Sequence, residues 1–188
     1  TLSTSAANAD QSIRSQDPLI MRGNVNLEGT DSDLLLESRK WTYWEGDAQI
    51  NGNIEILGGM HKSGVERIKD QGANAQGVSV YIKDTSSLTT TRANSQISIY
   101  ACQDAIVNGY LVAGGIVGDD GVNFVGPGSD IMIQAGGQAY VNTSLEASGD
   151  ISLQGGSGPY ADSLVQDAGV YLDTEGGMVA GAKPGSDQ

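Results

Sequence analysis

One short pattern recurs along the chain and restricts its fold more than any other feature. A small or polar residue is followed by two or three apolar residues at alternate positions, and often by glycine. Side chains of a β-strand point alternately to opposite faces, so each copy predicts a strand with one buried and one exposed face. The copies are GNVNLEG from Gly23, GNIEILGG from Gly52, GVSVYIKD from Gly77, SQISIYA from Ser95, SDIMIQAGG from Ser129, GDISLQGG from Gly149 and GVYLDTEGG from Gly169.

The spacing of these copies predicts how the strands are arranged. Ile97, Ile131, Ile151 and Val170 follow one another at steps of which the first is nearly twice the others, and AIVNGYLVAGG from Ala105 fills that longer step. A period of roughly 17 to 20 residues fits them, which is too short for a strand–helix–strand unit but holds one coil of a β-solenoid. Stacked coils bring parallel strands about 4.8 Å apart. The alternative is an antiparallel β-sandwich with a strand about every 8–12 residues, and the similarity of the copies favours the solenoid.

Glycine content agrees with this all-β prediction. The chain has 27 glycines among 188 residues, about twice the usual share, which favours many tight bends over long helices. We expect residues 23–179 to form the solenoid, with insertions at 38–50 and 58–76 where the pattern is interrupted. Residues 1–22 are expected to form an N-terminal arm or irregular coil, and residues 180–188 a linker or frayed tail.

Charge and cysteine content exclude several classes of function. The net charge of −13 disfavours nucleic acid and anionic membranes as partners, because phosphate binding needs clustered Lys and Arg, and the ten here are scattered. Cys102 is the only cysteine, so no internal disulfide and no cysteine-based zinc site is possible. No apolar run approaches the roughly 18 residues of a membrane span, and no signal peptide is recognisable.

The segments SGDISLQGG, GSDIMIQAGG and NGNIEILGG resemble the repeats of filamentous haemagglutinin-type bacterial adhesins. The resemblance covers about Gly23 to Gly177 and is a pattern of residue types. It implies a right-handed parallel β-helix in a large protein that is secreted or held at the bacterial cell surface. It also implies a non-enzymatic structural or adhesive role, with a host or neighbouring cell surface, glycans or matrix as partners.

Two other functions remain open. The chain could be a self-assembling filament or sheath subunit, because the end coils of a solenoid expose sheet edges that can pair with another copy. It could also be a polysaccharide lyase or hydrolase of the β-helix type, which needs two or three carboxylates converging on one outer face. Acidic residues are dispersed over the predicted outer positions, so we expect no enzymatic activity and assign no catalytic residue.

The segment WTYWEGD is the first candidate for ligand contact. It contains Trp41, Tyr43 and Trp44, and it directly follows Arg39 and Lys40. Aromatic rings flanked by charges suit sugar stacking or a protein contact. The structural alternative is an aromatic plug at an open end of the solenoid, or packing of an inserted loop on a flank.

Two further segments have weaker chemical signals. MHKSGVERIKD, within 58–76, holds much of the positive charge and predicts a short helix or a lateral loop, where the lone His61 makes a poor metal site. Asp119 and Asp120 lie between glycines and could supply oxygen ligands to Ca²⁺, although a plain turn is the favoured interpretation. No other cofactor is expected.

Overall fold

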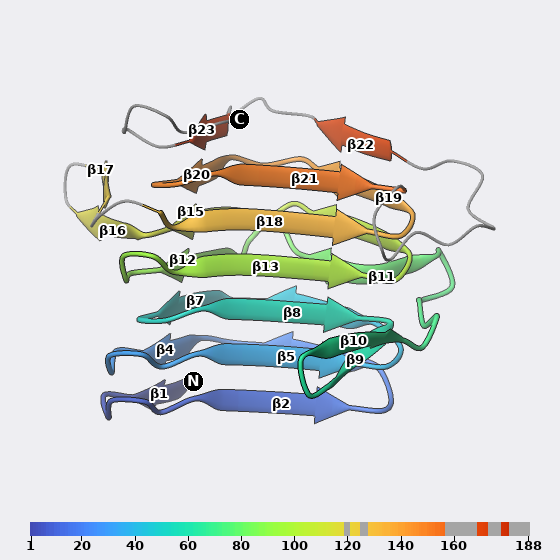
Figure 1. The fold of residues 1–188 in the computed structure, drawn as a ribbon, viewed down its shortest axis with the longest axis horizontal. Helices are drawn as coiled ribbons and strands as arrows, with labels where there is room; N and C mark the ends of the chain where they lie inside the picture. Colours follow the sequence, from blue (N-terminus) through green and yellow to red (C-terminus); the bar gives the residue numbers. More distant parts are fainter. Residues whose placement is uncertain (119–120, 125–127, 157–168, 173–177, 181–188) are drawn as a thin grey trace.

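Three parallel β-sheets form the body of the protein (Figure 1). The computed structural model describes residues 1–118, 121–124, 128–156, 169–172 and 178–180, and these residues contain strands but no helix. The chain visits the sheets in a fixed order, A then B then C, and then returns to sheet A one strand further along. Three consecutive strands, one from each sheet, are here called a repeat. The prediction of stacked parallel strands is confirmed, and the antiparallel sandwich is wrong.

Each sheet is ordered by repeat. Sheet A contains β1 (Leu2–Thr4), β4 (Val25–Leu27), β7 (Asp47–Ile50), β12 (Ser87–Thr90), β15 (Tyr110–Ala113), β20 (Leu145–Ala147) and β23 (Met178–Ala180). Sheet B contains β2 (Gln11–Ser15), β5 (Leu34–Ser38), β8 (Ile54–Gly58), β13 (Gln96–Ala101), β18 (Asp130–Ala135) and β21 (Ile151–Gly155). Sheet C contains β3 (Leu19–Arg22), β6 (Thr42–Glu45), β11 (Val78–Ile82), β14 (Asp104–Val107), β19 (Gln138–Val141) and β22 (Gly169–Leu172).

Two antiparallel hairpins are added to this pattern. One is formed by β9 (Met60–Ser63) and β10 (Glu66–Lys69), between β8 and β11. The other is formed by β16 (Gly115–Gly118) and β17 (Gly121–Phe124), between β15 and β18. Asp119 and Asp120 lie between β16 and β17, outside the described residues.

The repeat is longer than the sequence pattern predicts. In sheet A, Leu2 pairs with Val25 and Val25 pairs with Ala48, so one repeat separates each of these residues from the next. That separation is longer than the longest predicted period. Only the closest repeats, in sheet B, are as short as that period, as from Ile131 to Ile151. The prediction was too short because it compared positions in different sheets: Ile151 lies in sheet B, and Val170 lies in sheet C.

The predicted boundaries also change. Residues 1–22 contain β1, β2 and β3, which form the first repeat of the stack rather than an arm. The predicted insertion at 38–50 contains β6 and β7, which are regular members of sheets C and A. Residues 58–76 do contain an added element, the β9–β10 hairpin. The predicted tail after Ala180 lies outside the described residues.

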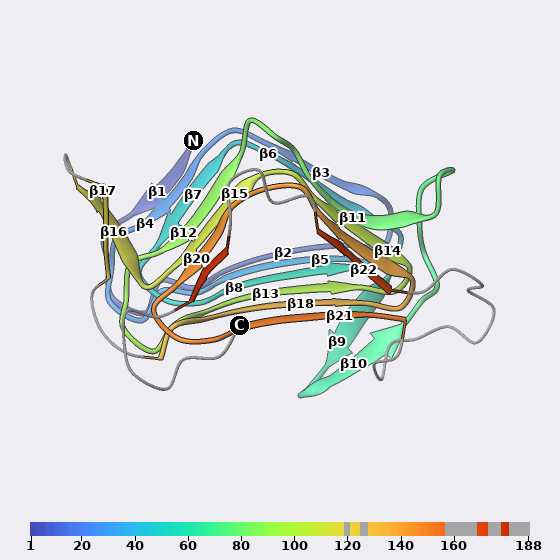
Figure 2. The same cartoon turned by 90° about the horizontal axis from the view of Figure 1, so that it is seen from above.

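Inward side chains from the three sheets fill a single core of triangular cross-section (Figure 2). Register places identical or similar residues above one another, as with Ile56, Ile99 and Ile133 in sheet B, all fully buried. No single repeat encloses its own apolar face, so most of the burial that stabilises the fold comes from neighbouring repeats. The segment SLEASGDISLQGG follows the predicted pattern, with Leu145, Ala147 and Ile151 buried and Asp150 exposed at the corner between β20 and β21.

A ladder of Asp and Asn side chains lines the corner where the chain passes from sheet A to sheet B. Asp10 Oδ1 accepts the backbone N–H of Asp33 at 3.0 Å, and Asp33 Oδ1 accepts that of Asn53 at 2.7 Å. Asn53 Oδ1 accepts the N–H of Gln96 at 2.9 Å, and Asp130 Oδ1 accepts that of Asp150 at 2.9 Å. Corner amides that fall between the strand ladders are thereby paired, and each side chain ties one repeat to the next.

Asp104 has the same role at the corner between sheets B and C, in a tighter setting. Its Oδ1 accepts the N–H of Gln138 at 2.8 Å, and a Cβ on Gly137 would lie only 2.1 Å from that oxygen. A larger residue at position 137 would therefore displace this carboxylate. Loss of solvent raises the pKa of Asp104, and the hydrogen bond from Gln138 opposes that shift only in part.

This raised pKa predicts a pH-dependent gain from Asp104→Asn. The folded protein binds the proton more tightly than the unfolded chain, so stability is lost as the pH rises from the pKa of the unfolded state through the pKa of the folded state. We expect the variant to melt at a higher temperature than the wild type at neutral pH, because the Asn oxygen still accepts the Gln138 N–H. The difference should shrink below about pH 4, where the wild-type carboxyl is protonated in both states.

The matched control is Asp10→Asn, because the exposed Asp10 accepts an equivalent N–H at the other corner. Thermal unfolding followed by circular dichroism between acidic and neutral pH is the measurement. An equal gain in both variants, or a gain for Asp104→Asn that is independent of pH, would contradict the desolvation account.

Candidate functional site

The aromatic segment predicted to contact ligands forms strand β6, and its side chains point alternately into the core and outward. In β6, alternation turns Trp44 into the core, where it is fully buried and its Nε1 donates to the carbonyl of Gly46 at 2.8 Å. Tyr43 points outward and is half-buried, and Trp41 is half-buried just before the strand. Arg39 and Lys40 are exposed before it. Trp44 is thus a core residue, and the other four stay candidates for contact.

The outer face around Tyr43 is a continuous row of side chains in sheet C. The row runs Ile20, Tyr43, Tyr81, Ile106 and Tyr140 in parallel register. The rings of Tyr43 and Tyr81 are stacked, with centroids 5.5 Å apart and planes 10° from parallel. Each of these two rings packs one of its faces against the other ring, and that face is not available for stacking on a sugar.

A charged row runs beside these tyrosines. Glu45 forms ion pairs with Arg22 and Lys83, which precede and follow it in the sheet. The hydrogen bond from Lys83 lowers the pKa of Glu45, and the same bond raises the pKa of Lys83. Burial raises the pKa of Tyr43, and the neighbouring Glu45 carboxylate adds to that effect. Opposite charges are therefore paired along this row, which is a stabilising arrangement across strands.

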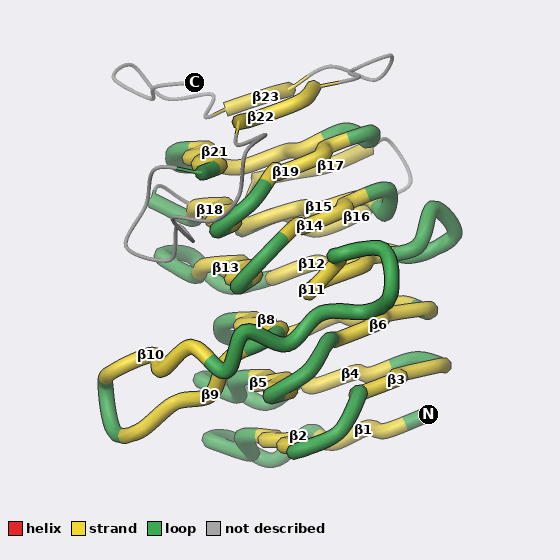
Figure 3. The backbone as a smooth tube through the Cα atoms, turned by 90° about the vertical axis from the view of Figure 1, so that its right-hand side faces the viewer, coloured by secondary structure: helices red, strands yellow, loops and turns green. Residues whose placement is uncertain are grey.

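The β9–β10 hairpin is the main departure from regular stacking on the outer face of sheet B (Figure 3). It replaces the helix or loop predicted for MHKSGVERIKD. The chain leaves sheet B at Gly59, whose φ of +73° favours glycine, and a Cβ there would lie 2.2 Å from the carbonyl oxygen of Gly72. At the far end of the hairpin, Val65 is 91% exposed. The hairpin thus projects from the stack beyond a fixed glycine.

A partly buried glutamate fastens the hairpin to the sheet. Glu55, in β8, forms ion pairs with Lys62 of β9 and Arg67 of β10, and Arg67 Nη2 lies 2.7 Å from Glu55 Oε1. The Arg67 guanidinium also lies 3.8 Å from the ring centre of Tyr100, in β13. Glu37, only 6% exposed, accepts the backbone N–H of Lys62 at 3.1 Å. These contacts involve three neighbouring strands of sheet B, so the hairpin has a defined position.

Apolar packing and a hydrogen bond between two side chains complete the base of the hairpin. Leu57, Met60, Tyr100 and Cys102 form a small buried cluster, separate from the main core. His61 Nδ1 lies 2.6 Å from Asp70 Oδ2 across the base of the hairpin. The lone cysteine is thereby accounted for as a small apolar residue of this cluster.

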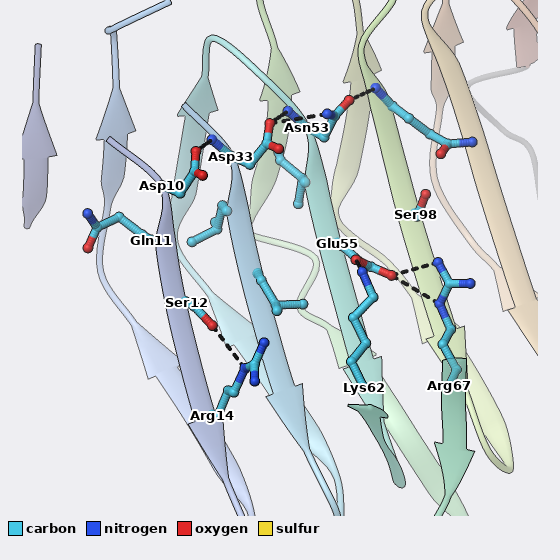
Figure 4. A pocket seen from close by; sticks show the side chains of 14 residues that line it. Asp10, Gln11, Ser12, Arg14, Asp33, Asn53, Glu55, Lys62, Arg67 and Ser98 are labelled. Carbon is cyan, nitrogen blue, oxygen red and sulfur yellow. Dashed lines mark hydrogen bonds and ion pairs between the residues drawn. The ribbon is translucent and has the colours of Figure 1, made fainter. Parts of the chain in front are cut away.

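A polar groove of about 430 Å³ lies beside the hairpin on the outer face of sheet B (Figure 4). It crosses β2, β5, β8 and β13, and its floor is the outward row Ser12, Leu35, Glu55 and Ser98. The corner ladder borders it where these strands begin, and cationic side chains border it further along the strands. The remaining lining residues are Asp10, Gln11, Arg14, Asp33, Leu34, Asn53, Ile54, Lys62, Arg67 and Gln96.

The groove offers both acceptors and donors with fixed positions. Asp10 and Asp33 each use Oδ1 for the ladder, while their Oδ2 atoms have no hydrogen-bond partner within the described residues. Arg14 donates from Nε to Ser12 Oγ at 3.1 Å, which leaves its two terminal nitrogens for a ligand. This is chemistry for binding hydroxyl, amide or carboxylate groups, because donors and acceptors lie on opposite sides of one floor.

Residues 1–22 supply Asp10, Ser12 and Arg14 to this groove, although the sequence pattern predicts an arm or irregular coil for that segment. The signal that reveals them is the position of polar residues relative to the strands. Asp10, Asp33 and Asn53 each stand directly before a strand of sheet B, at the same place in three consecutive repeats. Their separations along the chain equal the steps between those repeats, so the three side chains share one corner.

Several negative observations concern the described part of the chain only. There, no group of three or more His, Cys, Asp or Glu side chains is arranged to hold a metal ion, and the Ca²⁺ candidates Asp119 and Asp120 fall outside it. The described residues include no helix long and apolar enough to span a membrane. Comparisons of the chain with protein-family models, curated proteins and solved structures gave no match. A functional assignment must therefore be built from the fold and its side chains.

The burial difference between the two tryptophans predicts unequal effects of truncation. Trp44→Ala should lower the free energy of unfolding by about 3–5 kcal/mol, because it leaves a large cavity in the core. Trp41→Ala should cost only about 1 kcal/mol, because that ring is half-exposed. Urea unfolding of both variants is the measurement. Equal losses would mean that Trp44 does not pack inside the stack.

The role of Glu55 predicts that Glu55→Gln loosens the hairpin without melting the stack. Two cations lose their ion pair, and a neutral amide cannot replace it. We expect at least about a tenfold faster amide hydrogen exchange in residues 60–69, while β13 keeps its protection. The control is Glu66→Gln, on the exposed side of the same hairpin and in no ion pair of the described structure. Similar acceleration in both variants would refute the clamp.

Proposed function

We propose that this chain is a non-enzymatic structural and adhesive segment of a secreted or cell-surface bacterial protein, folded as a right-handed parallel β-helix. Its repeats would form the coils of a β-solenoid. In Figure 2 the chain passes along sheets B, C and A in an anticlockwise sense while later repeats lie nearer the viewer. That path supports the right hand, as does the strong preference of parallel crossovers for it.

The observation that carries the functional proposal is the position of the β9–β10 hairpin. Apart from the two hairpins, the described strands continue the three parallel sheets, and such regularity serves a scaffold, since each residue contacts its own equivalents above and below. Function in such folds is found on the elements that depart from the repeat. Here a clamped hairpin and a polar groove interrupt one outer face, which suits contact with a cell surface, glycan or matrix component.

The carboxylates of the groove favour binding over catalysis. Asp10 and Asp33 each hold a backbone amide of the next repeat, and Glu55 is paired with Lys62 and Arg67. A lyase or hydrolase needs carboxyl groups that are able to exchange protons with a substrate. Here each of these acidic groups is held by a scaffold contact, and Asp10 and Asp33 keep one oxygen that is placed to accept a hydrogen bond from a ligand. The acidic net charge also suits a protein outside the cell.

End-to-end self-association is the second candidate, and the first repeat favours it. Strands β1, β2 and β3 lie at the edges of their sheets, and Leu2 in β1 is 37% exposed. Unpaired strand edges are able to accept strands of another copy. A partner that stacks here would continue all three sheets and cover the exposed end of the core.

The adhesive segment and the filament subunit predict different particles. Negative-stain imaging and sedimentation at roughly micromolar concentration should reveal single short rods, because side-face contacts alone do not polymerise a solenoid. Polysaccharide incubations should release no new reducing ends or unsaturated products. Ordered end-to-end polymers would favour the filament subunit instead. Turnover of any polysaccharide at a rate proportional to protein concentration would refute the non-enzymatic role.

A further inference from the structure

We infer that the groove beside the β9–β10 hairpin binds an uncharged saccharide chain lying across β2, β5, β8 and β13. This inference deepens the proposed adhesive role, on which it rests, by naming the ligand class and the atoms that recognise it. It concerns the outer face of sheet B rather than the predicted aromatic segment.

The shape of the groove fits a short linear ligand. Its volume of about 430 Å³ falls within the usual range for small-molecule sites. Four neighbouring strands contribute to its lining, and three strand spacings span about 14 Å along the stack. A ligand that follows the stack therefore meets equivalent positions of successive repeats, as a chain of similar sugar units requires.

The acceptors of the groove are spaced by the repeat itself. Asp10 and Asp33 lie at the same corner position of consecutive repeats, as the register between β2 and β5 requires. In each, Oδ1 is fixed by a backbone N–H, so Oδ2 is held towards the groove without further cost in side-chain entropy. Fixed carboxylate oxygens accept hydrogen bonds from hydroxyl groups, and charged acceptors make the stronger bonds.

The donors lie across the floor from these carboxylates. Arg14 Nε donates to Ser12 Oγ and lies 3.7 Å from Glu37 Oε2 in an ion pair, and the described residues include no hydrogen bond from its two terminal nitrogens. Ser98 contributes a hydroxyl to the same floor. Leu35, between Ser12 and Glu55 in the outward row, gives an apolar surface for the C–H face of a sugar ring. Donors, acceptors and a small apolar patch together match a polyhydroxyl ligand better than a purely apolar one.

The charge balance of the groove favours an uncharged ligand. Its lining holds three carboxylates, Asp10, Asp33 and Glu55, and three cations, Arg14, Lys62 and Arg67. Glu55 alone lies between Lys62 and Arg67, and the six charges of the lining sum to zero, so no net positive charge is left to attract an anion. The chain as a whole carries −13, which repels polyanions at a distance. The groove therefore discriminates against acidic polysaccharides on two counts.

The test uses the full chain, isotopically labelled, in an NMR titration against named probes. These are the neutral trisaccharides maltotriose, cellotriose, mannotriose and chitotriose, with trigalacturonate as anionic probe and spermidine as cationic probe. We expect at least one neutral trisaccharide to shift the amide signals of Asp33, Asn53 and Ser98 with a Kd of about a millimolar or below. The affinity for this trisaccharide should change less than about twofold between low and high salt, because an uncharged ligand forms no ion pair that salt could screen.

Asp33→Asn removes one acceptor and keeps the ladder. The Asn oxygen is able to hold the next backbone amide, as Asn53 already does one repeat later. We expect about a tenfold weaker affinity for the neutral trisaccharide, equal to one lost hydrogen bond to a charged group. The control Asp130→Asn changes a carboxylate with the same role in the ladder but outside the groove, and it should leave the affinity within about twofold.

Three results would overturn the assignment: no neutral trisaccharide binds, a charged probe binds more tightly than all neutral ones, or both variants lose affinity equally. Failure of the proposed function gives a different result. Cleavage of a bound trisaccharide would refute the non-enzymatic role while supporting the groove as a saccharide site. Binding of trisaccharide by single rods, without cleavage, supports both proposals.

Discussion

Every feature of this protein depends on the parallel register between successive repeats. Backbone hydrogen bonds join each strand to its equivalent in the next repeat, so a residue contacts the same position above and below it. A side chain that packs well against its own kind is therefore favoured, and Ile97, Ile131 and Ile151 form such a column. The same register aligns polar groups at the corners and charges on the outer faces. Buried apolar side chains and outward polar side chains are consequently both spaced by the distance between neighbouring strands.

This register explains what the sequence could reveal. Alternation of apolar and polar residues identified strands because one face is buried in every repeat, and glycine-rich closes identified bends. The length of the repeat was wrong for a physical reason. Strands of sheets B and C have the same alternating pattern, so Ile151–Gly155 and Gly169–Leu172 look alike in sequence although β21 lies in sheet B and β22 in sheet C. Only residues with a position-specific role, such as the corner Asp and Asn, distinguish one sheet from another.

Aromatic and charged residues were harder to place from sequence. Trp44 looked like part of a contact loop because two tryptophans and adjacent charges interrupt the aliphatic pattern, yet it fills one wide position of the core. The groove was missed because its parts come from four strands that lie far apart in sequence. The β9–β10 hairpin was expected as an insertion, but its strands lack the strict alternation that predicts a buried face. Its structure depends instead on ion pairs with Glu55 that no local pattern encodes.

Within one Asp side chain of the corner ladder, one oxygen stabilises the fold and the other is available to a ligand. In Asp33, one oxygen pairs the backbone amide of Asn53, and this bond holds the second oxygen at the border of the groove. A carboxylate in a flexible loop would lose side-chain entropy on binding a ligand, whereas this one has already lost it on folding. The corner position accepts either Asp or Asn for the structural bond, as Asn53 demonstrates. The ladder uses one oxygen of Asp10 and of Asp33, and at the border of the groove the second oxygen of each is the acceptor that the proposed ligand hydroxyl would use.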